Sequence, residues 1–170
     1  MSADRDDPPA AGGTYTLLIE LPTAATVEVG ALGAVDLQAG GYAYTGSALG
    51  TGGFSRVDRH RRIADGEHDV RHWHIDYLLG QPSTRIIDVT RSYGADIECA
   101  VAGRLPSGPV DGFGASDCDC GSHLAHMDRI DALAERVERA HRRAAARAER
   151  GDAGETTGDD RGYDNRPSRH

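Results

Sequence analysis

The chain has 170 residues, a length typical of one domain, so a multidomain machine is excluded. Hydrophobic residues make up 38% and charged residues 27%, which is enough for one modest core with tails left over. All 19 basic residues are arginine, aspartate outnumbers glutamate by 19 to 8, and the formal net charge is −8. These features indicate a GC-rich genome and a high-salt cytoplasm, and the overall charge argues against ordinary nucleic-acid binding.

Membrane insertion and secretion find no support in the sequence. No run approaches the roughly 20 apolar residues that span a bilayer, and Met1 to Pro9 lacks the apolar core of a secretory signal. Three cysteines, at positions 99, 118 and 120, do not make a disulfide framework. The sequence therefore predicts a cytoplasmic protein with no membrane partner.

In chain order, residues 1–12 are predicted to be a disordered leader because they are acidic and rich in proline and alanine. Strands follow at 14–21 and 40–48, with a hairpin at 25–38 between them, and then a helix from Phe54 to Asp65-Gly66. Residues 72–79 fit a strand or a short helix, and we favour the helix. A strand at 84–90, a helix at 95–105, a loop at 106–114 and an amphipathic helix at 128–150 come next. Residues 151–170 are predicted to be a disordered tail, so the folded domain is expected at 13–127.

The charges are not spread evenly over these segments. Residues 13–127 hold 8 arginines and 14 acids, whereas residues 128–150 hold 7 arginines and 5 acids. Four arginines lie on the first helix, at positions 56, 59, 61 and 62. Because salt shortens the reach of electrostatic forces to about 3 Å at 1 M, local arginines matter more than net charge in a salt-rich cytoplasm. The acidic composition therefore describes a habitat and does not exclude a phosphate-binding surface.

Two tyrosines and an arginine form the first candidate constellation. Gly13-Thr14-Tyr15 opens one strand, Tyr44-Thr45-Gly46 closes another, and Arg56 lies on the next helix. Two phenols beside a guanidinium can orient and deprotonate water at a phosphodiester, while the arginine holds the developing charge. The alternative is that these tyrosines simply pack well in strands.

Two further features carry metal-binding side chains. Glu98 lies on a helix after a strand, where a solvated surface role is the alternative. Cys118-x-Cys120-x-x-His123 has thiolate and imidazole ligands that suit zinc, with His72, His74 and Asp76 upstream. The Cys-x-Cys spacing is tighter than usual, so we favour a buried, hydrogen-bonded polar elbow over zinc or a Cys/His nucleophile.

Read in order, the motifs resemble a known family. They are Gly-x-Tyr, Gly-Tyr-Ala-Tyr-Thr-Gly-Ser-Ala, Arg-x-x-Arg-His, Trp-His-Ile-Asp-Tyr-Leu-Leu, Glu-Cys and Phe-Gly-Ala-Ser-Asp-Cys-Asp-Cys-Gly-Ser-His-Leu. This string resembles the Uri-type (UvrC/intron-endonuclease) branch of the GIY-YIG nuclease superfamily, long described as a domain of unknown function. The resemblance covers about residues 12–127. It implies a small α/β domain with a short central antiparallel sheet flanked by helices.

The resemblance also implies a reaction and its residues. Tyr15 and Tyr44 stand at the two signature tyrosines, and Arg56 stands at the helical arginine that stabilises the phosphate. His60 is a further candidate catalytic residue, and Glu98 is the candidate ligand of one divalent metal, Mg²⁺. The implied chemistry is hydrolysis of a DNA phosphodiester, with one tyrosine, or water near it, as the base.

Some assignments stay open at this point. Asp76 is the alternative metal ligand, and a second part of the site is expected from the branch motifs, namely His74, Asp117, Cys118, Cys120 and His123. The leading hypothesis is a metal-dependent endonuclease acting on DNA rather than RNA. The alternatives are a non-catalytic nucleic-acid-binding module that retains the fold, and a structural protein that binds a partner through helix 128–150.

Overall fold

A computed structural model describes residues 12–69, 71–106, 108, 110, 112–113 and 122–161, with side chains as far as residue 150. The strands are β1 (Gly13–Leu21), β2 (Ala25–Glu28), β3 (Ala34–Leu37), β4 (Gly40–Ser47), β5 (Arg85–Tyr93) and β6 (Leu124–Met127). The helices are α1 (Ser55–Ala64), α2 (His74–Leu79), α3 (Glu98–Ala102) and α4 (Ile130–Arg161), with a 3-10 turn, η2, at Gly30–Leu32. The fold is a mixed α/β domain, as the sequence predicts.

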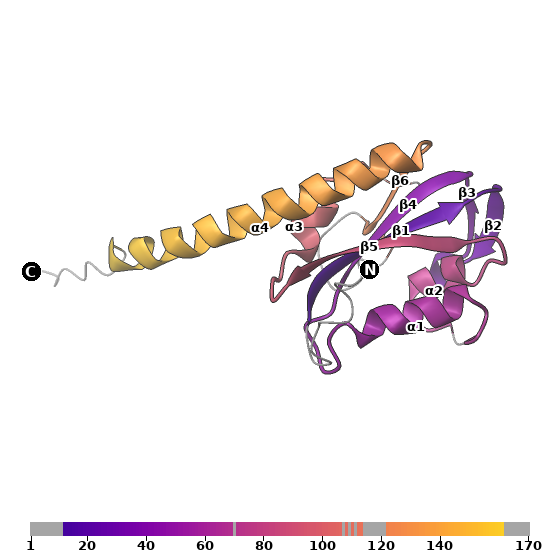
Figure 1. Cartoon of the computed structure of the whole chain (residues 1–170), viewed down its shortest axis with the longest axis horizontal. Coiled ribbons are helices and arrows are strands. Elements are labelled where there is room, and N and C mark those ends of the chain that lie inside the picture. The colour runs from indigo at the N-terminus through magenta and orange to yellow at the C-terminus, as the bar shows by residue number, and fades with distance from the viewer. Residues whose placement is uncertain are drawn as a thin grey trace, which may run out of the picture.

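The central sheet has the strand order β5-β1-β4-β6, and its neighbouring strands are antiparallel. Strands β2 and β3 follow β1 and precede β4 in the chain, and they form a separate two-stranded hairpin. Helices α1 and α2 cover one face of the central sheet, and α4 crosses the other face and extends beyond it (Figure 1). The predicted central antiparallel sheet flanked by helices is confirmed.

Alternation along the strands divides the interior into two layers. On β1, Leu17 and Ile19 pack in the core that contains Val57 of α1, whereas Leu18 packs in the cluster that contains Leu133 of α4. Successive side chains of a strand point to opposite faces, so a strand that is buried along nearly its whole length, like β1, must be covered on both sides. A third small cluster joins α3 to α4.

Several predicted boundaries differ from the structure. Helix α3 occupies only Glu98–Ala102 of the predicted 95–105, because the Thr14 hydroxyl donates to the carbonyl of Ala95 and accepts from the N–H of Ile97. Strand β5 runs past the predicted 84–90 to Tyr93, because it pairs with β1 along its length.

The predicted helices at 72–79 and 128–150 are both present in the structure. Residues 72–79 contain the favoured helix, which begins at His74. The predicted helix 128–150 corresponds to α4, whose backbone stays helical to Arg161, into the predicted disordered tail. That segment has no proline to interrupt the backbone hydrogen bonds, and the first later proline is Pro167. Residues 1–11 and 162–170 lie outside the described residues.

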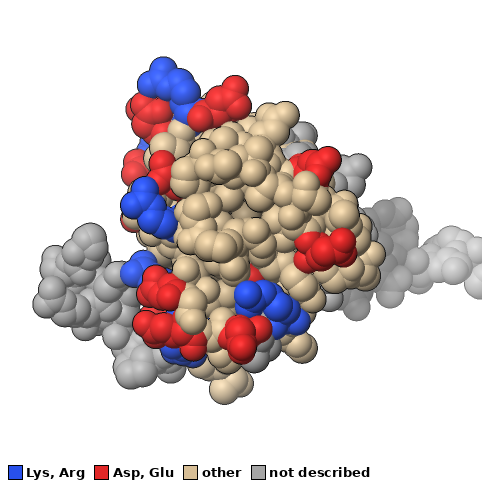
Figure 2. Space-filling view, turned by 90° about the vertical axis from the view of Figure 1, so that its right-hand side faces the viewer, with Lys and Arg blue, Asp and Glu red and all other residues tan. Residues whose placement is uncertain are grey.

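Charged side chains of both signs lie on the surface of the described chain. Viewed from the side where the β2–β3 hairpin lies, acidic and basic side chains are interspersed around an uncharged centre (Figure 2). Among the residues searched, those that the structure describes, no helix has the length and apolarity needed to cross a bilayer.

Candidate active site

A buried phenol–imidazole pair lies between the sheet and α1. The hydroxyl of Tyr15 on β1 lies 2.7 Å from Nε2 of His60 on α1, and both side chains are almost fully buried. Tyr15 pairs with Gly46 on β4, and a Cβ on that glycine would lie 2.6 Å from the Tyr15 hydroxyl oxygen. The glycine of the Tyr-Thr-Gly motif therefore provides the space that the Tyr15 hydroxyl occupies.

Tyr44 lies beside this pair on the next strand. Its ring centroid lies 6.5 Å from that of Tyr15 and 6.1 Å from that of His60. Tyr15 and Tyr44 point to the same face of the sheet because both pack in the core cluster shared with α1. The two signature tyrosines are thus neighbours in the fold, although the β2–β3 hairpin separates them in the sequence.

Burial sets the protonation states of these groups. The pKa of Tyr15 is raised well above 10, first by burial and then by the nearby Tyr44, while Arg56 lowers it. The pKa of His60 is lowered to about 4, mainly by burial, against an opposing effect of Asp76. At neutral pH the pair therefore consists of a neutral phenol and a neutral imidazole, so one imidazole nitrogen is free of a proton and can accept a hydrogen bond.

Arg56 lies at the edge of this cluster. One of its guanidinium nitrogens donates to the carbonyl of Ser47 at 2.6 Å, and its Cζ lies 4.8 Å from the ring centroid of Trp73. These two contacts hold the guanidinium at the end of β4. Its charge lowers the pKa of both Tyr15 and Tyr44, as a cation near a developing phenolate must.

Glu98 reaches the same cluster from the first turn of α3. Its charge raises the pKa of Tyr15 and Tyr44, as a carboxylate in the neighbourhood of a phenol does. One carboxylate oxygen lies 3.1 Å from Nδ1 of His123, and a quarter of the Glu98 side chain is exposed. We call Tyr15, Tyr44, Arg56, His60 and Glu98 the candidate active site.

Asp76, the alternative metal ligand, is occupied by other partners. Arg59 donates to both of its carboxylate oxygens, at 3.0 and 2.9 Å, and the backbone N–H groups of His72 and Trp73 donate to one of them. Burial raises the pKa of Asp76, but these hydrogen bonds outweigh it, so the net pKa is lowered. With no exposed surface, Asp76 supports Arg59 and the start of α2.

The predicted second part of the site is only partly described. The ring of His74 packs edge-on against Phe113, which also contacts Tyr44. His123 is buried, and its Nε2 lies 3.9 Å from the sulfur of Cys99. Asp117, Cys118 and Cys120 lie outside the described residues. Within the residues that are described, no three His, Cys, Asp or Glu side chains form a group that could hold a metal ion.

Two contacts of the site had little signal in the sequence. Trp73 anchors Arg56, and His123 contacts Glu98, yet each pair is far apart in the chain. The motifs Trp-His-Ile-Asp and Ser-His-Leu mark Trp73 and His123 as unusual, but motif order does not predict which side chains meet. The Thr14 contacts that set the start of α3, and with it the position of Glu98, had no sequence signal.

The fold and site together define a class: a small α/β protein with a buried tyrosine–histidine pair, flanked by an arginine and a carboxylate. A family model described as "Domain of unknown function DUF123" matches residues 14–146, most of the chain, and the protein belongs to this family. No match was found among curated proteins or among solved structures.

Proposed function

We propose that this protein is a metal-dependent endonuclease of the Uri-type branch of the GIY-YIG superfamily, hydrolysing phosphodiester bonds in DNA. The observation that carries the proposal is the hydrogen bond between the Tyr15 hydroxyl and Nε2 of a neutral, buried His60. Arg56 and Glu98 lie close enough to affect the pKa of the same phenol. A proton acceptor, a cation and a carboxylate are the groups that phosphodiester hydrolysis requires.

In the proposed reaction, a water oxygen attacks phosphorus while its proton passes to the Tyr15 oxygen. Tyr15 gives its own proton to Nε2 of His60, which is the acceptor in the tautomer that carries its proton on Nδ1. The phosphorus–oxygen bond to the leaving strand then breaks, the leaving oxygen takes a proton from solvent water, and the proton held by His60 returns to solvent. Arg56 stabilises the negative charge that develops on the phosphate oxygens.

The residues present fit one Mg²⁺ ion. Mg²⁺ keeps several waters and is commonly bound through one or two carboxylates plus substrate phosphate, so a single, partly exposed carboxylate is a suitable protein ligand. Glu98 has that exposure, and Asp76 does not. The bound ion would supply charge neutralisation at the phosphate. Zinc at Cys118, Cys120 and His123 is the less favoured cofactor. The proposed partner is DNA, and the proposed location of the protein is the cytoplasm.

A second candidate is a nucleic-acid-binding module that retains this fold without catalysis. Tyr15 and Tyr44 are only 1% and 9% exposed, and burial raises the pKa of both phenols. Water must therefore reach a phenol that is hard to deprotonate. The two candidates differ in activity and agree in binding, so both properties must be measured.

The test is plasmid nicking by the full-length protein in high salt, with Mg²⁺ or with EDTA. We expect Mg²⁺-dependent nicking, reduced about 10²-fold or more in Tyr15→Phe and in Arg56→Ala, because each removes a group acting on the transition state. The matched control is Tyr42→Phe. Tyr42 lies on the same strand as Tyr44, and the substitution removes a hydroxyl that donates to the carbonyl of Gln38.

Three results distinguish the candidates. Nicking that survives in Tyr42→Phe and is lost in Tyr15→Phe supports the endonuclease. DNA binding without nicking by the wild-type protein supports the non-catalytic module. Equal nicking by the wild type and Arg56→Ala would point to a contaminating nuclease and reject the proposed site.

A further inference from the structure

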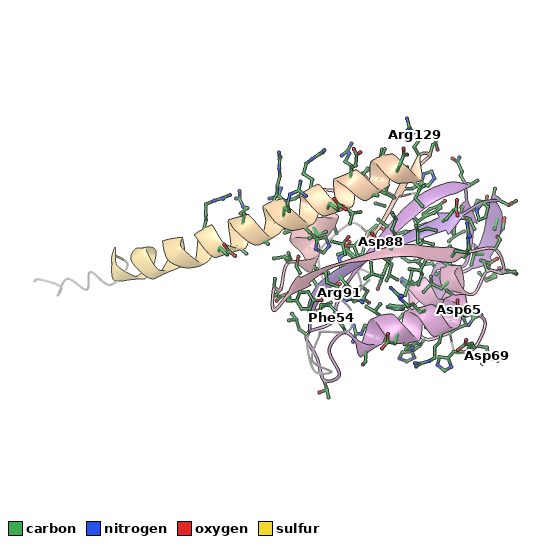
Figure 3. All side chains as sticks on the ribbon, viewed as in Figure 1. Phe54, Asp65, Asp69, Asp88, Arg91 and Arg129 are labelled. Carbon is green, nitrogen blue, oxygen red and sulfur yellow. The ribbon has the colours of Figure 1, made fainter. Side chains whose placement is uncertain are left out.

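The arginines of α1 divide between two cavities. Arg56, Arg59 and Arg62 line a cavity of about 360 Å³ together with Trp73, which we call the Trp73 cavity. Arg61 instead lines a cavity of about 350 Å³ with Asp65 and Arg85. The two cavities have no lining residue in common, and Figure 3 shows Phe54 and Asp65 at opposite ends of α1. The four arginines that the sequence places on one helix therefore belong to two separate surfaces.

Trp73 holds two of these guanidinium groups in place. The Cζ atoms of Arg56 and Arg59 lie 4.8 and 4.4 Å from its ring centroid, well within the distance of a cation–π interaction. Arg59 is also paired with the buried Asp76. These contacts already order the side chains of Arg56 and Arg59 before a ligand binds, so binding costs less rotamer entropy. The cavity therefore presents ordered hydrogen-bond donors.

The charges of this cavity favour an anion. Three guanidinium groups face one lining carboxylate, Asp58, and the charge of Arg59 is compensated by Asp76. Arg62 is exposed, and among the described residues no ion pair or hydrogen bond of its side chain is found. Arg56 and Arg62 are thus the cations available to a ligand.

The spacing of these cations suits a nucleic-acid strand. Arg56 and Arg62 are six positions apart on one helix, or about 9 Å along its axis at 1.5 Å per residue. A DNA strand carries one phosphate per ~3.4 Å of helix axis. A strand that runs along α1 with one phosphate at Arg56 therefore brings another phosphate, two or three nucleotides away, alongside Arg62.

We propose that the Trp73 cavity is a backbone-phosphate subsite in which Arg62 binds a phosphate two or three nucleotides away from the one being cleaved. This inference rests on the proposed endonuclease function, because Arg56 belongs to both the candidate active site and the cavity. Contacts to phosphate position a strand without reading its sequence. The subsite thus selects a continuous strand over a single nucleotide or free phosphate.

The test compares Arg62→Gln with Arg61→Gln, its neighbour on the other cavity. Binding of a fluorescein-labelled DNA duplex is followed by anisotropy in EDTA, so that cleavage cannot occur, over a series of salt concentrations. We expect Arg62→Gln to bind about tenfold more weakly and to lower the salt slope by about 0.9, the value for one phosphate contact. Arg61→Gln should match the wild type in both quantities.

Trp73 supplies an independent readout because it is the only tryptophan. The duplex should change its emission in the wild type, and inorganic phosphate at the same concentration should not. Equal affinity and equal salt slope in both variants would overturn the subsite, as would an equal response to free phosphate. If DNA binding depends on Arg62 but the protein does not nick DNA, the subsite is retained and the catalytic proposal is rejected. If the protein nicks DNA equally well without Arg62, the catalytic proposal is retained and the subsite is rejected.

Discussion

At the scale of single residues, the candidate site depends on one missing methyl group. Tyr15 is almost fully buried, and its hydroxyl reaches His60 across the backbone of Gly46. Any side chain at position 46 would occupy the space of that hydroxyl. Because protein interiors are close-packed, such an overlap must move the ring or the strand.

Replacing this glycine should therefore damage stability and site together. We expect Gly46→Ala to lower the free energy of unfolding by about 1–3 kcal/mol, the usual cost of overpacking a core, because the new Cβ would lie 2.7 Å from Cζ of Tyr15. Urea denaturation measures this change. Gly50→Ala is the matched control, since a Cβ there meets no atom within 4 Å. Equal stability of the two variants would contradict the packing argument.

At the scale of secondary-structure elements, a polar network joins α4 to the sheet. Nε2 of His141 lies 2.8 Å from the Thr16 hydroxyl on β1, and its Nδ1 lies 2.8 Å from the Ser92 hydroxyl on β5. The Thr16 hydroxyl also contacts that of Thr45 on β4, at 2.9 Å. Burial lowers the pKa of His141 to about 4, so α4 docks with a neutral imidazole.

This network predicts a loss of stability in mild acid. His141 and His60 have their pKa lowered from 6.5 to about 4, so between these values the unfolded chain binds more protons than the folded one. Stability is therefore full above pH 6.5 and falls as the pH drops toward 4, by up to about 3 kcal/mol for each histidine. Urea denaturation across this range measures the slope.

The variant His141→Gln tests the contribution of α4. Its side chain cannot titrate, so its unfolding free energy should depend less steeply on pH between 6.5 and 4, with the remaining dependence due to His60. A slope identical to that of the wild type would show that His141 does not resist protonation in the folded protein.

At the scale of the whole molecule, α4 belongs to the folded unit. Its apolar side chains complete two of the three core clusters, with Leu133 and Val137 against the sheet and Ala140 and Ala144 against α3. The family match ends at residue 146, close to the last of these contacts. The predicted domain limit at 127 therefore divides a continuous core, and docking accounts for the amphipathic pattern of the helix.

Two truncations test this account. Ending the chain after residue 127 should abolish cooperative unfolding, because full burial of Leu133 and Val137 contributes about 1.5–3 kcal/mol each to a typical total of about 5–15 kcal/mol. Ending it after residue 150 should leave the Tm unchanged, since residues 147–150 of α4 are exposed. Thermal unfolding followed by circular dichroism measures both. A stable, monomeric 1–127 fragment would instead favour α4 as a helix that binds a partner.

Local patterns in the sequence determined most of the elements. The apolar run of β1, the tyrosines of β4 and the periodicity of α1 each specify their own conformation through side-chain spacing. The motifs also pointed to Tyr15, Tyr44, Arg56, His60 and Glu98, because a resemblance can be matched position by position without knowledge of contacts.

Only the tertiary structure decided which of these side chains meet. Asp76 and Glu98 are both carboxylates near the start of short helices, and the sequence offered both as candidate metal ligands. Arg59 occupies both oxygens of Asp76, while Glu98 pairs with His123 and keeps a quarter of its side chain exposed. Such pairings join residues far apart in the chain, and they depend on how sheet and helices pack. The spacing of side chains along the chain does not predict that packing.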